Sequence, residues 1–115
     1  MQRNLFVSAA AILALTGAIL LGSSSHAHAA DTTANQITID NFSFSPATIN
    51  VKTGTEVTWV NHDDIPHTVV SDDKTTVKSR PLDTDEKFTF KFDKPGTYNY
   101  FCSIHPKMTG KVVVQ

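Results

Sequence analysis

The sequence has little of the cysteine that usually stabilises a small domain through disulfide bonds, because its 115 residues contain a single cysteine, Cys102. One thiol excludes a disulfide within the chain. A domain of this size buries a modest share of its surface and often needs an additional staple. Cys102 is therefore either a buried thiol or a ligand of a stabilising metal ion.

The chain also lacks a basic excess, with 10 Lys and Arg against 11 Asp and Glu. Nucleic-acid-binding proteins neutralise phosphates with clustered Lys and Arg, so this balance argues against a nucleic acid as partner. Acidic residues of the polar stretches, such as Asp63, Asp64, Asp72 and Asp73, have Lys and Arg nearby. We interpret these mixed charges as a solvated surface.

The first thirty residues differ from the rest, since Arg3 is their only charged side chain and an apolar or small stretch runs from Leu5 to Leu21. This pattern is typical of a secretory signal peptide. Residues 27–29 match the small-x-small cleavage pattern, so we predict cleavage after Ala29, with cleavage after Ala30 as the alternative. An uncleaved anchor fits less well, because the apolar stretch is shorter than the roughly 20 residues that span a bilayer.

These observations predict a signal peptide at residues 1–29 and one exported domain at residues 30–115. The domain is expected in a periplasm or otherwise outside the cytoplasm, without stable membrane insertion after cleavage. His26 and His28 leave with the signal peptide, so three of the five histidines remain.

The remaining sequence shows short alternating runs of apolar residues and no pattern for a long helix. We expect one bent strand over residues 37–44, ended by Pro46, two strands joined by a glycine turn over residues 47–61, and a polar loop over residues 72–86. Further strands are predicted at residues 88–92, 97–102 and 111–115. Even spacing with turn signals between strands indicates an all-β fold, an antiparallel β-sandwich.

Strand alternation predicts the direction of the cysteine. In the segment TYNYFC, Tyr98, Tyr100 and Cys102 share one face, and the aromatic pair makes it the core face. Cys102 therefore points inward at one end of the sandwich. His105 and Met108 follow in a short loop, where Pro106 restricts His105 to extended conformations.

A thiolate, an imidazole and a thioether form a soft set of metal ligands. Two His and one Cys with a distant axial Met are typical of blue copper sites, whereas zinc sites use Cys, His and carboxylates. The second histidine is His62 or His67. We choose His67, which starts a predicted strand after Pro66, because His62 lies among polar residues in a predicted exposed loop.

Three segments then carry a family resemblance: VKTGTEVTWVN, IPH and PGTYNYFCSIHPKMTGKVVV. Together they resemble the cupredoxins from about Ile37 to Val114, and the spacing Cys-x-x-His-x-x-Met is similar to that of the amicyanin branch. The resemblance implies an eight-stranded Greek-key sandwich with one type 1 (blue) copper. By the same resemblance, the copper ligands are His67, Cys102, His105 and Met108.

The implied function is the shuttling of single electrons between redox proteins through Cu(II) and Cu(I). Amicyanin relatives take electrons from a dehydrogenase and pass them to a c-type cytochrome, so such a donor, and a cytochrome or oxidase acceptor, are the expected partners of a monomer. Ile65, Pro66 and Pro106 are the expected apolar rim for docking. The alternative is copper storage or delivery. We expect no enzyme, because copper oxidases and nitrite reductases need more histidines than three.

One residue departs from the family pattern. Most cupredoxins have asparagine after the first ligand histidine, where its side chain ties that loop to the loop of the cysteine, and this chain has Thr68. The backbone N–H of Thr68 is expected to donate to the Cys102 sulfur. The side-chain tie must be shorter or lost.

Overall fold

The computed structural model describes residue 17 and residues 35–115, so the predicted signal peptide and its cleavage site lie outside the described residues, apart from Gly17. The described part contains eight strands: β1 (Gln36–Asp40), β2 (Ser43–Ser45), β3 (Thr48–Val51), β4 (Thr55–Asn61), β5 (Val70–Ser71), β6 (Lys87–Phe92), β7 (Gly96–Phe101) and β8 (Thr109–Val114). Within it, no helix is long and apolar enough to cross a membrane.

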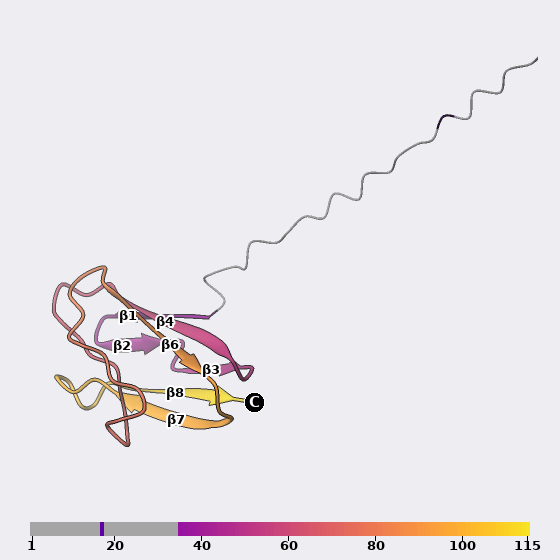
Figure 1. The fold of residues 1–115 in the computed structure, drawn as a ribbon. Helices are drawn as coiled ribbons and strands as arrows, with labels where there is room; N and C mark the ends of the chain where they lie inside the picture. Colours follow the sequence, from indigo (N-terminus) through magenta and orange to yellow (C-terminus); the bar gives the residue numbers. More distant parts are fainter. Residues whose placement is uncertain (1–16, 18–34) are drawn as a thin grey trace, which may run out of the picture.

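The strands form two layers, which confirms the predicted sandwich (Figure 1). One sheet has the order β2-β1-β4-β6 and the other has the order β3-β8-β7-β5. Both sheets are mixed, because β1 pairs with β4 and β3 pairs with β8 in parallel. Alternation of side chains is the same in parallel and antiparallel strands, so the sequence pattern did not reveal these two pairs.

The single bent strand expected over residues 37–44 is wrong, because this segment is a hairpin of β1 and β2. Its two-residue turn consists of Asn41 and Phe42, with φ values of 49° and 57°. Two positive φ values are what a tight hairpin turn requires. The apolar alternation survives the turn because Ile39 and Phe44 are paired and both face the core.

The core lies between the two sheets and is centred on aromatic residues. Trp59 of β4 is fully buried and packs its ring 5.5 Å from that of Tyr100 on β7 and 5.8 Å from that of Phe88 on β6. Tyr100 of β7 and Cys102, which directly follows that strand, are both buried, as the alternation predicted. The cysteine is therefore an extension of the core, not a surface thiol.

The segment of residues 72–86 is more than the polar loop expected. Val77 and Leu82 are buried, and two isolated bridges pair Val70 with Lys78 and His67 with Leu82. The segment thus packs along the β5 side of the fold and fixes the backbone at His67. Its two apolar residues stand singly among polar neighbours, which is why no periodic pattern revealed them.

Three connections meet at one end of the sandwich, at the left of Figure 1. They are the β1–β2 turn, the segment of residues 62–69 after β4, and the loop of residues 102–108 between β7 and β8. Hydrogen bonds join the segment of residues 62–69 to the β1–β2 turn and to the loop of residues 102–108. This end carries the candidate site.

Candidate metal centre

Three of the four predicted ligands converge at this end. The ligand atoms of His67, Cys102 and His105 all lie within 4.8 Å of one another. The Cys102 Sγ is 3.6 Å from Nδ1 of His67 and 3.9 Å from Nδ1 of His105. His67 and Cys102 are fully buried and His105 is partly exposed. Among the described residues, this is the one such group of His, Cys and acidic side chains.

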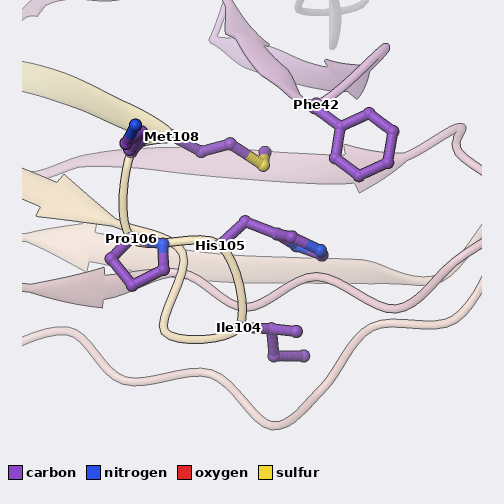
Figure 2. Close-up of a pocket in the computed structure, with 6 residues that line it drawn as sticks. Phe42, Ile104, His105, Pro106 and Met108 are labelled. Atoms are coloured by element: carbon purple, nitrogen blue, oxygen red, sulfur yellow. The ribbon is translucent and has the colours of Figure 1, made fainter.

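The loop that carries three of the predicted ligands is closed by its own backbone. The N–H of Cys102 donates to the carbonyl of Met108 at 3.1 Å, and the N–H of Met108 donates to the carbonyl of His105 at 2.9 Å. Met108 is 5% exposed. Figure 2 shows the side chains of His105 and Met108 on the side of the loop that faces Phe42. The loop therefore carries a thioether on the same side as the His105 imidazole.

His67 is held on both sides by backbone pairing with Leu82, with N–H to carbonyl distances of 3.1 and 2.7 Å. Its ring is fixed by Asp63, because Nε2 lies 2.7 Å from Oδ2 of that carboxylate. A carboxylate only accepts, so Nε2 carries the proton and Nδ1, which faces Cys102, has a free lone pair. His62 is exposed and lies outside the group, in agreement with its interpretation as a loop residue.

Asp63 is a functional residue that the sequence analysis missed, since we interpreted it as a solvated acid. Its side chain is 11% exposed, and its carboxylate accepts hydrogen bonds from the N–H groups of Asn41 at 2.7 Å and Phe42 at 3.0 Å. Burial raises the pKa of Asp63, but the bonds from Phe42, His67 and Asn41 outweigh it and hold that pKa below its ordinary value. One ionised carboxylate thus joins the β1–β2 turn to His67.

Phe42 is the second missed residue. Its ring meets the ring of His67 edge-on at 5.6 Å and that of His105 at 5.1 Å. A bulky residue at positive φ is an outlier that costs about 1–3 kcal/mol, and such strain gathers at functional sites. The bonds to Asp63 hold this conformation, so that Phe42 covers the two imidazoles.

The Cys102 sulfur has polar neighbours that favour a thiolate. Burial raises its pKa, but hydrogen bonds to the sulfur, first among them the one from the backbone N–H of Thr68 at 3.4 Å from Sγ, outweigh burial and hold the pKa below its ordinary value. The expected N–H donation from Thr68 is thus confirmed. Thiolate is the form that binds metal.

The side-chain tie between the two loops is kept in a shorter form. The N–H of Ser103 donates to Thr68 Oγ1 at 2.7 Å, and the hydroxyls of the two residues are also 2.7 Å apart. Ser103 supplies the contact that asparagine would otherwise make by reaching across. The two loops therefore remain joined beside the sulfur.

The donor set fits copper. It combines a thiolate and two imidazole nitrogens in a small buried group, with a thioether in the same loop and no carboxylate in the group. Soft sulfur ligands with imidazole suit copper, whereas carboxylates are common in zinc sites. The Asp63 carboxylate is bound to the far nitrogen of His67, where it orients the ring.

A family model described as "Cupredoxin-like domain" matches residues 11–114. The chain belongs to the cupredoxin family. The match begins inside the predicted signal peptide, so the boundary after Ala29 stays a prediction. As a cupredoxin with this donor set, the protein is a carrier of one type 1 copper.

Two curated relatives and one solved structure show how close this cupredoxin is to known members. It is 32% identical to amicyanin-alpha of Methylorubrum extorquens over 100% of both chains. It is 40% identical to the chloroplastic plastocyanin of Tetradesmus obliquus, over 63% of this chain and 58% of that protein. A purple cupredoxin from Nitrosopumilus maritimus superposes with a TM-score of 0.65 and 35% identity, covering 70% of this chain and 98% of that chain.

The surface beside His105 is apolar and hollowed. A depression of about 460 Å³ is lined by Phe42, Ile104, His105, Pro106, Lys107 and Met108 (Figure 2). Phe42 and Ile104 are the two large hydrophobic side chains that are most exposed in the described part, at 51% and 48%. Of the rim residues that we expected, Pro106 lines this depression and Ile65 is half-buried.

Proposed function

We propose that this cupredoxin is an exported carrier of single electrons and not an enzyme, and that His67, Cys102, His105 and Met108 hold its copper. The observation that carries the proposal is the convergence of two imidazole nitrogens on one buried sulfur. Bound copper would supply a one-electron couple between Cu(II) and Cu(I). The chain supplies a donor set that is fixed before any electron arrives.

Each part of that donor set is fixed by hydrogen bonds that do not use its donor atoms. Backbone pairing with Leu82 and the Asp63 carboxylate fix His67, and two backbone hydrogen bonds close the loop of Cys102 and His105. A rigid set changes little between two oxidation states, which keeps the reorganisation on electron transfer small. Burial of His67 and Cys102 excludes water, and the partly exposed His105 offers the shortest way to the surface.

The partners that we propose are other redox proteins, which would dock on the apolar surface around His105. A dehydrogenase as donor and a c-type cytochrome or an oxidase as acceptor fit the likeness to amicyanins. An export route through the predicted signal peptide would place the monomeric domain in a periplasm or outside the cell. Nucleic acid is not among the proposed partners, because the chain carries no basic excess.

The first test replaces the sulfur ligand. Full-length protein, exported and loaded with Cu(II), is expected to show an intense blue band and a narrow copper hyperfine splitting. Cys102→Ser should remove both, because the band arises from the thiolate, while His62→Ala should keep them because His62 lies outside the group. Visible and electron paramagnetic resonance spectra measure this. Ascorbate should bleach the band reversibly without release of copper.

A pale spectrum shared by the parent protein and Cys102→Ser would overturn the proposal, since copper would then be held without the thiolate. A blue protein that releases its copper on reduction would instead indicate copper storage or delivery. Measuring free Cu(I) after each reduction cycle distinguishes an electron carrier, which retains its copper, from a storage or delivery protein, which releases it.

The docking surface gives a second test. Ile104→Glu places a charge in the apolar depression, where contact with a partner would desolvate it, so electron transfer to a c-type cytochrome is expected to slow by about tenfold. Thr97→Glu, an exposed position at the start of β7, is the matched control and should leave the rate unchanged. Stopped-flow rates at fixed ionic strength measure the effect. Equal rates for both variants would place docking elsewhere.

A further inference from the structure

The pair of hydroxyls beside the sulfur is a feature of this chain's own sequence. Thr68 follows His67, Ser103 follows Cys102, and together they replace the asparagine tie. Thr68 is 4% exposed and Cys102 is fully buried, whereas Ser103 lies at the surface. Besides its contacts with Ser103, Thr68 Oγ1 lies 3.8 Å from the Cys102 Sγ, within the range of a hydrogen bond to sulfur.

The hydrogens of this cluster can be counted. A threonine hydroxyl has one hydrogen to donate and two lone pairs to accept with. The N–H of Ser103 fills one lone pair of Thr68 Oγ1. The contact between the two hydroxyls, at 2.7 Å, can run in either direction. If Ser103 donates, both lone pairs of Thr68 are filled and its hydrogen points to the Cys102 sulfur. If Thr68 donates, the sulfur loses this second donor.

The Thr68 hydrogen has two possible acceptors, the Ser103 hydroxyl and the Cys102 sulfur, and their surroundings decide which one receives it. Ser103 is exposed, so water can serve its hydroxyl in either state. The sulfur is fully buried, so no water reaches it. A hydrogen bond to a charged acceptor is about twice as strong as one between neutral groups. The arrangement with the Thr68 hydrogen on the thiolate therefore has the lower energy.

We propose that the Thr68 hydroxyl donates a second hydrogen bond to the Cys102 thiolate, and that the Ser103 hydroxyl donates to Thr68 Oγ1 and does not compete with the sulfur for the Thr68 hydrogen. The inference rests on the proposed function, since it takes Cys102 as the copper ligand. Hydrogen bonds at the ligand sulfur tune the potential of blue copper sites. The second bond withdraws electron density from the sulfur and favours Cu(I) over Cu(II).

The test compares three variants of the copper-loaded protein. Thr68→Val keeps the shape and the backbone N–H but removes the hydroxyl, so the equilibrium constant for reduction by a mediator of known potential is expected to fall about three- to tenfold. The blue band should move to longer wavelength, because the sulfur orbitals rise in energy. Thr68→Ser retains the hydroxyl and should restore both values.

Ser103→Ala distinguishes the two possible directions of the hydrogen bond between the Thr68 and Ser103 hydroxyls. If the Thr68 hydrogen already lies on the sulfur, it stays there when the Ser103 hydroxyl is removed, and the equilibrium constant should change less than about twofold. If Thr68 donates to Ser103 in the parent protein, Ser103→Ala frees that hydrogen for the sulfur and raises the constant. Such a rise, or a Thr68→Val variant with unchanged potential and band, overturns the inference.

The failure of this inference is distinguishable from the failure of the proposed function. A parent protein without a blue band contradicts the copper–thiolate site itself. A blue parent whose variants all have the same potential contradicts only the role of the two hydroxyls. Thermal unfolding of each apoprotein shows whether a variant is folded before its spectrum is compared.

Discussion

Asp63→Ala is expected to lower the free energy of unfolding of the apoprotein by about 2–4 kcal/mol and the copper affinity by about 10- to 100-fold. The carboxylate accepts three hydrogen bonds, from Asn41, Phe42 and His67. Its loss leaves Phe42 in a strained backbone conformation without support, and it frees the His67 ring to rotate. Urea denaturation measures the first effect, and competition with a chelator for Cu(I) measures the second.

Two companion variants show whether the hydrogen bonds are the cause. Asp64→Ala removes the neighbouring exposed acid and should change stability by less than about 0.5 kcal/mol. Asp63→Asn keeps one acceptor oxygen but loses the acceptor Oδ2 or Oδ1, so an intermediate loss is expected. If Asp63→Ala were as stable as Asp64→Ala and bound copper as tightly, the β1–β2 turn and His67 would hold their conformations without the Asp63 carboxylate.

The parts of the site that sequence reasoning predicted are those encoded locally. Alternation along β7 placed Tyr100 and Cys102 on the core face, because strand geometry leaves two faces and one of them was aromatic. Two spacings of three residues put His105 and Met108 in one short loop with Cys102. The sandwich followed from the same alternation, repeated in short strands.

The parts that sequence reasoning missed depend on contacts between distant residues. Asp63 binds the N–H groups of residues that lie 21 and 22 positions away, and Thr68 meets Ser103 across 35 positions. The sequence of a polar loop does not show whether its acidic side chain is solvated or accepts hydrogen bonds from a distant turn. The same limit applies to the hairpin of β1 and β2, because Asn-Phe is not a typical pair for a two-residue turn. What the sequence does show there is an aromatic residue that breaks the alternation, Phe42.

Gly110→Ala is expected to destabilise the fold by about 3 kcal/mol or more, a loss that places it among the severe core substitutions. Gly110 of β8 is paired with Tyr100 of β7, and the Tyr100 ring lies across the space that a Cβ would fill. The ring has no room to withdraw, because it packs 5.5 Å from Trp59 and 4.8 Å from Phe44. Thermal and urea unfolding of the apoprotein measure the loss, and Gly54→Ala, where a Cβ meets no atom within 4 Å, is the variant with backbone cost alone.

Tyr100→Phe tests the other side of the same contact and is expected to be neutral or to stabilise the fold by about 1 kcal/mol. Among the described residues, the buried Tyr100 hydroxyl has no hydrogen-bond partner, and burial raises its pKa to about 12. The unfolded chain releases this proton near pH 10, so the parent protein should lose stability between about pH 10 and pH 12, whereas Tyr100→Phe should lose less. If both proteins show the same alkaline loss, the hydroxyl is solvated in the folded state.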